Sequence, residues 1–171
     1  MEQEDKIQEI GSFDDFLNPQ VQSTPEQTKE TDNLFNRFAA ERLQWTKTIK
    51  EMSENFKNVM KISDLMLTVY TDRQRAVEYY HYLISLLVQI NKKYRKAYAE
   101  KYDFYSYKSQ KRFPNETTKN NQIQTELEDI LEKRELIENH SKFMENTIKS
   151  ADQMIYGVKY RIEIEQIARG K

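Results

Sequence analysis

The fold is decided by residues 77 to 105, VEYYHYLISLLVQINKKYRKAYAEKYDFY, in which apolar and aromatic side chains recur every three or four residues. This spacing places one set of side chains on a single face of a helix. The set comprises Val77, Tyr80, Ile84, Leu87, Asn91, Tyr94, Tyr98 and Tyr105. Thr71 and Asp72 form a helix start signal, and Pro114 ends helical structure, so we predict a helix at about 72 to 106.

The same spacing appears on both sides of this stretch. Thr24-Pro25-Glu26 supplies a hydroxyl cap, a first-turn proline and an acid, which predict a helix over about 25 to 62. Its apolar face contains Phe38, Trp45, Ile49, Met52, Phe56 and Val59. A last helix is predicted at about 119 to 169, with Ile123, Leu127, Ile130, Ile137, Met144, Ile148, Ala151, Ile155, Val158 and Ile162 on its apolar face. Gly157 lies inside it, where close approach by a neighbour would explain a glycine.

The composition agrees with an all-α fold, because the 171 residues include only three Gly and three Pro. Helices this long cannot bury their apolar faces within a compact globule. We therefore expect a long antiparallel helical hairpin, coiled-coil-like, with an additional N-terminal helix, assembling into a homo-oligomer. The residues expected in the core and at the oligomer contacts are Tyr94, Tyr98, Tyr105, Ile148, Ile155, Val158 and Ile162.

Residues 1–24 have an acidic, polar composition without helical periodicity, so they are predicted to be a disordered tail preceding a helical domain at 25–171. Within the tail, GSFDDFL at 11 to 17 has the alternation of a docking peptide, although solvated tails often carry such patterns. No stretch is long and apolar enough for a membrane span, and the N-terminus has no signal-peptide core. A cytoplasmic protein without membrane association is expected, in the bacterial host cytoplasm if phage-encoded.

Catalytic motifs are absent from the sequence. There is no cysteine, no glycine-rich phosphate loop, no nucleophile elbow and no zinc or calcium motif. Glu78 and His81 lie one turn apart, as in di-iron bundles, but the second histidine, His140, has Ile137 at the matching position. Both histidines are predicted to be structural or on the surface, and we expect a non-enzymatic protein without cofactor or metal.

Positive charge is concentrated in residues 92 to 112, which carry eight Lys/Arg against two acids, a net charge of +6. Residues 1 to 32 carry nine acids against two lysines, a net charge of −7. At 100° per residue, Tyr94, Tyr98 and Tyr105 continue the apolar face, whereas lysine and arginine side chains and other aromatic side chains point away from it. This second set could be a solvated helix end, or a nucleic-acid site in which bases stack on exposed rings. It comprises Lys92, Lys93, Lys96, Lys101, Phe104, Tyr107, Lys108, Lys111 and Arg112.

Two motifs resemble one known family. Lys101-Tyr102-Asp103-Phe104-Tyr105 is similar to the basic-x-Asp-aromatic-aromatic signature of the UvsY family of recombination mediators from T-even-like bacteriophages. The run from Met154 to Lys171 is similar to that family's terminal helix, and the similarity covers about residues 75 to 171. The resemblance implies a homo-oligomeric ring that binds single-stranded DNA and helps a RecA-like recombinase replace the single-stranded DNA-binding protein.

The sequence therefore predicts a non-enzymatic recombination mediator whose basic helix end holds single-stranded DNA. We also hypothesise that the acidic tail competes with DNA for this basic stretch, since the two segments have opposite charge. The alternative is a coiled-coil structural or assembly adaptor, such as a phage scaffold or tail component, whose lysines only solvate it. Charge reversal at Lys101, Lys108 and Lys111 would leave the function of an adaptor intact.

Overall fold

The computed structural model describes residues 25–56 and 62–170. All regular elements in these ranges are helical: α2 (Pro25–Asn55), α3 (Ile62–Asp103), the π-helical turn η2 (Phe104–Lys108), α4 (Glu116–Glu126) and α5 (Glu128–Ala168). The all-α prediction is confirmed. The predicted disordered tail and its GSFDDFL segment, at 1–24, lie outside the described residues, as does Val59.

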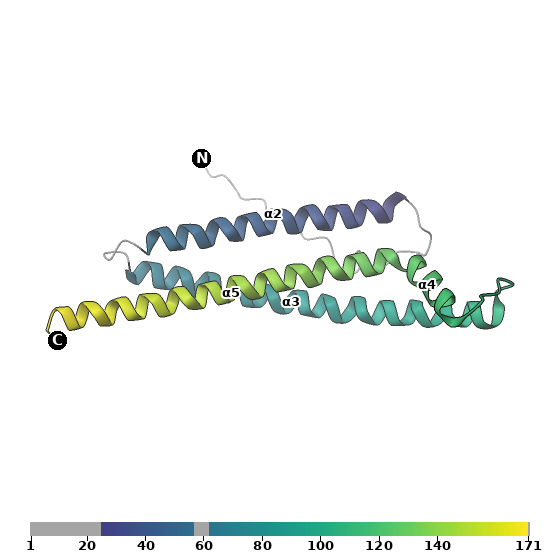
Figure 1. The fold of residues 1–171 in the computed structure, drawn as a ribbon. Coiled ribbons are helices and arrows are strands. Elements are labelled where there is room, and N and C mark those ends of the chain that lie inside the picture. The colour runs from purple at the N-terminus through teal and green to yellow at the C-terminus, as the bar shows by residue number, and fades with distance from the viewer. Residues whose placement is uncertain (1–24, 57–61, 171) are drawn as a thin grey trace, which may run out of the picture.

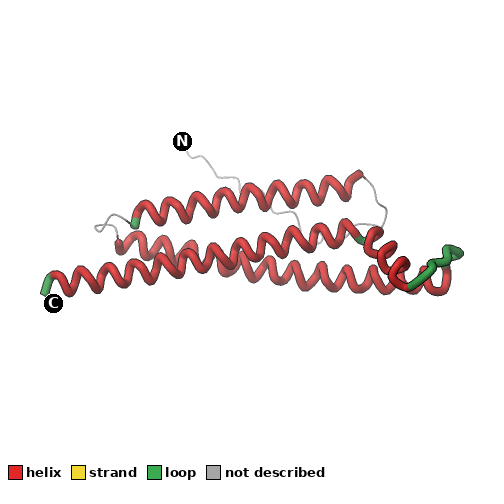
Figure 2. The backbone as a smooth tube through the Cα atoms, in the orientation of Figure 1, coloured by secondary structure: helices red, strands yellow, loops and turns green. Residues whose placement is uncertain are grey.

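Three long helices, α2, α3 and α5, lie side by side in an elongated bundle, with the short α4 at one end (Figures 1 and 2). Two ion pairs define the direction of α3 against α5: Arg73 meets Asp152, and Lys101 meets Glu126 where α4 ends. The two helices therefore run in opposite directions. The turn after α3 and the C-terminus lie at opposite ends of the bundle (Figure 1).

The core consists of two clusters of buried side chains along the bundle. The first contains Phe38, Ala76, Leu83, Leu86, Ile90, Ile137 and Met144. The second contains Met52, Leu65, Val69, Ala151, Ile155 and Val158. Each cluster draws on α2, α3 and α5, so the N-terminal helix is part of the core and not an appendage.

The buried face of α3 differs from the predicted one by about one position. Ala76, Leu83, Leu86 and Ile90 are the buried residues, whereas Tyr80 and Leu87 pack at the edge of the first cluster. Val77 and Ile84 are also only partly buried. The reason is tertiary: α3 packs against α5 and also touches α2, so its apolar face is broader than one three/four repeat.

Two predicted helix limits are wrong. α3 begins at Ile62 and not near 72, and α2 ends at Asn55 and not at 62. The Thr71 hydroxyl donates to the Leu67 carbonyl at 2.9 Å, a contact made inside a helix and not at its start. Leu65 and Val69, which precede Thr71, are buried in the second cluster. Tertiary burial therefore extends the helix through residues that look like a start signal.

The last predicted helix begins earlier and is interrupted. Asn115 caps α4, because its side-chain oxygen accepts from the Thr118 backbone N–H at 2.8 Å. The helical path breaks at Leu127, whose φ of −108° and ψ of 13° separate α4 from α5. Ile123 and Leu127 are both buried at this break. α4 can therefore pack against the end of α3, while α5 runs along the bundle.

Gly157 faces the end of α2. A methyl group at this position would lie 3.2 Å from Cζ of Phe56, closer than ordinary van der Waals contact. Nη1 of Arg161 donates to the Phe56 carbonyl at 2.7 Å, one turn further along α5. The close approach expected at Gly157 is therefore made by an aromatic ring.

Candidate nucleic-acid interface

The predicted basic and aromatic residues come together at the turn that follows α3. The backbone widens there into η2, in which the Ser109 N–H donates to the Phe104 carbonyl at 2.8 Å. Such π-helical turns are rare in proteins, and those that occur are often found at functional sites. The chain then becomes extended at Ser109 and continues to the Asn115 cap of α4.

The turn exposes two aromatic rings. Tyr107 is 83% exposed and Phe104 is 47% exposed. Phe104 meets Tyr105 edge to face at 5.3 Å between ring centroids, and Tyr105 meets Phe113 in the same way at 5.2 Å. Tyr107 has no ring contact within the described residues. The Phe104 ring is therefore supported by a neighbouring ring, whereas the Tyr107 ring is free to stack on a planar ligand.

The same turn carries uncompensated positive charge. Residues 104 to 115 include Lys108, Lys111 and Arg112 and no carboxylate. All three side chains are exposed, and Lys111 lies 5.2 Å from the centre of the Phe113 ring and donates to Gln122 at 3.0 Å. Lys108 and Arg112 have no ion pair within the described part of the chain. Their charge is available to an anionic partner.

A second group of bases lies on one exposed face of α3. Arg95 and Lys96 follow Lys92 by three and four residues, so the three side chains project from one side of the helix. Among the described residues, Lys96 makes a single, long ion pair of 4.0 Å with Glu100, and both side chains are exposed. Sequence reasoning missed Arg95, although its position between the two lysines on this face could have indicated it.

Two of the predicted binding lysines point toward other helices. Lys93 is half-buried, and burial together with the nearby charge of Lys133 lowers its pKa, opposed by Glu30. Lys133 itself is buried and pairs with Glu30 at 2.8 Å. Nζ of Lys101 lies 2.7 Å from the Glu126 carboxylate. Lys93 and Lys101 therefore already lie beside charged side chains of other helices, unlike Lys92, Lys108 and Arg112.

Glu126 is the centre of a polar cluster that ties α3 and η2 to α4. Its carboxylate accepts from Lys101, from Nε2 of Gln122 at 3.0 Å and from the Tyr105 hydroxyl. Burial by itself would raise the pKa of Glu126, but these donors lower it overall. The hydrogen bond to Glu126 raises the pKa of Tyr105 to about 12. No pattern in the sequence indicated Glu126, because Lys101 and Tyr105 reach it only when α4 folds back against the end of α3.

The residues predicted for the core and oligomer contacts separate into three groups. Ile155 and Val158 are buried, and Ile148 packs against the first cluster. Tyr94, Tyr98 and Tyr105 are partly buried, and the Tyr98 hydroxyl donates to Asn120 at 2.9 Å. Ile162 is 36% exposed and belongs to neither cluster. Most of these residues are therefore used inside one chain.

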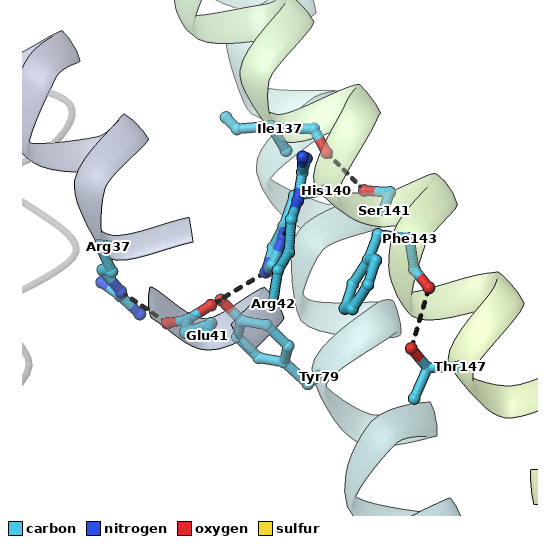
Figure 3. Close-up of polar contacts among 9 residues, drawn as sticks. All are labelled: Arg37, Glu41, Arg42, Tyr79, Ile137, His140, Ser141, Phe143 and Thr147. Atoms are coloured by element: carbon cyan, nitrogen blue, oxygen red, sulfur yellow. Dashed lines mark hydrogen bonds and ion pairs between the residues drawn. The ribbon is translucent and has the colours of Figure 1, made fainter. Parts of the chain in front are cut away.

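A second polar cluster lies in the middle of the bundle, where α2 meets α3 and α5 (Figure 3). His140 of α5 is fully buried and stacks on Phe38, with ring centroids 4.1 Å apart. Its Nε2 lies 2.9 Å from Oε2 of Glu41, and Nε of Arg42 lies 3.3 Å from its Nδ1. Glu41 also accepts from the Tyr79 hydroxyl at 2.5 Å. Of the predicted structural histidines, His140 is buried, and His81 is exposed beside Tyr80.

The electrostatics of this cluster favour an ionised Glu41. Burial would raise the pKa of Glu41, but hydrogen bonds from His140, Tyr79 and Arg37 lower it to about 2. Burial and the bond to Glu41 raise the pKa of Tyr79. In the described ranges, every buried side-chain nitrogen or oxygen has a hydrogen-bond partner. The cluster is therefore suited to hold the three helices in register, since its buried polar atoms are all used inside the bundle.

Two other kinds of feature are absent from the part of the chain that the structure describes. Within residues 25–56 and 62–170, no three His, Cys, Asp or Glu side chains are arranged to hold a metal ion. Over the same residues, none of the helices has an apolar run sufficient to cross a bilayer. The turn after α3 and the adjoining face of α3 remain the candidate site.

No protein-family model, curated protein or solved structure matches this chain. The resemblance to the UvsY-type mediators and the nucleic-acid roles of the residues above therefore stay predictions.

Proposed function

We propose that this protein is a non-enzymatic mediator of recombination that binds single-stranded DNA at the turn after α3. The observation that carries the proposal is that an 83% exposed tyrosine, Tyr107, shares its turn with two exposed cations, Lys108 and Arg112, which have no ion pair within residues 25–56 and 62–170. A single strand presents phosphates and unpaired bases together. Cations neutralise the phosphates, and stacking on an aromatic ring holds a base without regard to sequence.

The exposed face of α3 extends this surface. Lys92, Arg95 and Lys96 lie on the helix that leads into the turn, so a strand leaving the turn would meet further positive charge. One copy offers only a short site. Repetition of the site in a homo-oligomer would raise the effective concentration of each further contact.

A surface suited to such assembly lies on the outer side of α5. Tyr156, Tyr160, Ile164 and Ile167 recur at spacings of four, four and three, and each is at least 61% exposed. They lie opposite Ala151, Ile155 and Val158, which face the core. We propose that this stripe makes the homo-oligomer contact, in place of Ile155 and Val158, which are occupied inside the chain. A closed ring is the form that the resemblance implies.

The mediator role beyond DNA binding rests on the resemblance alone. In that role the protein would help a RecA-like recombinase replace the single-stranded DNA-binding protein. The alternative of a coiled-coil structural or assembly adaptor is supported by the same exposed stripe on α5. An adaptor would oligomerise in the same way but would not bind DNA.

A fluorescence anisotropy titration with labelled oligo-dT separates the two functions. We expect binding that weakens as salt rises, with each phosphate contact adding about −0.7 to the slope of log affinity against log salt. Reversing charge at Lys92, Lys108 and Arg112 should abolish binding and also abolish recombinase loading onto coated DNA. Oligo-dT binding that is absent at low salt, or indifferent to salt, would favour the adaptor.

A further inference from the structure

The Glu126 cluster lies beside the proposed DNA surface and has the composition of an anion site. Four side chains from four consecutive segments contribute polar groups: Lys101 from the end of α3, Tyr105 from η2, Lys111 from the loop between η2 and α4, and Gln122 from α4. Lys101, Tyr105 and Gln122 donate to the Glu126 carboxylate, and Lys111 donates to Gln122 at 3.0 Å. Glu126 is thus the anion that these donors now share.

A carboxylate and a phosphate present similar oxygen acceptors to such donors. The lysine ammonium is a compact point charge that can pair with either anion. Hydroxyl and amide groups can likewise donate hydrogen bonds to the oxygens of either one. The site is also accessible from solvent, since the side chains of Lys101 and Glu126 are 34% and 23% exposed. A phosphate of a bound strand could reach Lys101 without unfolding of the bundle core.

Exchange of one anion for the other is energetically inexpensive. Ion pairs between partly exposed side chains contribute little to stability, because water competes for both partners. Glu126 is on the last turn of α4, just before the break at Leu127, so its side chain can turn to solvent without disturbing a long helix. Lys101 would lose one partner of modest value and gain a phosphate, with release of a counterion from the DNA.

We propose that Glu126 is a resident anion that a phosphate of the single strand replaces when DNA binds. The proposal rests on the proposed DNA-binding function and adds a specific residue that regulates it. In the free protein, Glu126 neutralises Lys101 and holds η2 against α4. In the complex, Lys101 contacts the strand, and Glu126 is released to solvent. The Glu126 carboxylate therefore weakens DNA binding, although it also organises the turn that binds the DNA.

The test compares Glu126→Gln with Glu128→Gln, in the full-length protein, by anisotropy with labelled oligo-dT over a range of salt. Both variants remove one negative charge, but Glu128 is exposed and has no ion pair within the described residues. We expect Glu126→Gln to bind up to about fivefold more tightly than Glu128→Gln, the scale of one exposed ion pair. Helix content and thermal unfolding of both variants should match the wild type, which excludes misfolding.

The slope of the salt titration then identifies Lys101 as the group released. Lys101→Met should lower the magnitude of the slope by about 0.7, both in the wild type and in the Glu126→Gln background, since one phosphate contact is lost. Equal affinities for the two Gln variants, or a slope unaffected by Lys101→Met, would overturn the exchange while leaving DNA binding intact. Failure of all variants to bind the oligonucleotide would refute the proposed function itself.

Discussion

Nε2 of His140 lies 2.9 Å from the carboxylate of Glu41, so a histidine of α5 and an acid of α2 meet inside the bundle. Arginine can only donate, and Nε of Arg42 reaches Nδ1 of the same ring. Nδ1 must therefore accept, and Nε2 must carry the proton that it donates to Glu41. This fixes one neutral tautomer, because a proton on Nδ1 would face the guanidinium.

We predict that His140→Ala destabilises the protein far more than His81→Ala. The first substitution removes a fully buried ring stacked on Phe38 and leaves Glu41 and Arg42 without their shared partner. A cost of about 2 to 4 kcal/mol in the free energy of unfolding is expected. His81 is exposed, so its loss should change this free energy by less than about 0.5 kcal/mol. Urea denaturation measures both, and equal losses would contradict a role for the buried cluster.

The low pKa of Glu41 predicts a specific acid sensitivity. A carboxyl group whose pKa is lowered from 4.5 to about 2 on folding contributes stability above pH 4.5, and this is lost as pH falls toward 2. The contribution is on the order of 3 kcal/mol. In urea melts between pH 7 and 2, the stability difference between wild type and Glu41→Gln should shrink over this interval. A difference that stays constant with pH would show that Glu41 is not the group responsible.

The packing at Gly157 predicts a steric effect on stability. Gly157→Leu would push the leucine side chain into the Phe56 ring, since even a single methyl group at this position would lie 3.2 Å from the ring. Overpacking of this kind typically costs about 1 to 3 kcal/mol, more than leucine gains in helix propensity over glycine. The melting temperature should fall for Gly157→Leu and hold for the control Gln153→Leu, an exposed position one turn earlier. An unchanged melting temperature for Gly157→Leu would mean that the end of α2 is not held against α5.

Exposed rings at η2 should contribute to DNA affinity and not to folding. Tyr107→Ala is expected to weaken oligo-dT binding by about 5- to 150-fold, the value of stacking one base. The salt slope should be unchanged, because no phosphate contact is removed. Tyr82→Ala, at an exposed ring in the middle of α3, serves as the control and should retain full affinity. Equal behaviour of the two variants would remove the stacking role from Tyr107.

The outer stripe of α5 predicts how copies associate. Ile164→Glu places a charge in the middle of the stripe, where a contact between copies would have to bury it without a partner. We expect the variant to be monomeric in mass-resolved sizing at concentrations where the wild type is oligomeric. Gln166→Glu adds the same charge to the same helix off the stripe and should leave assembly unchanged. Persistence of the oligomer in Ile164→Glu would place the contact elsewhere.

Local patterns in the sequence predicted the helical character of the chain, but not all of its helix limits. The three/four spacing identified α5 and its core residues, from Ile137 to Val158, because one face of that helix packs inward. The same spacing misjudged α3, whose buried face is broadened by contact with two helices. It also misread Thr71 and Asp72, since a start signal has no effect where Leu65 and Val69 are buried upstream.

By itself the sequence determined that the chain is helical, that the central helix ends before Pro114, and that Phe104 and Tyr107 point away from the apolar face. These properties depend on neighbours within one or two turns. Only the tertiary structure decided that Lys101 pairs with Glu126 and that His140 meets Glu41, 99 residues away. Such pairs depend on the register in which distant helices pack, and periodicity within one helix carries no information about register.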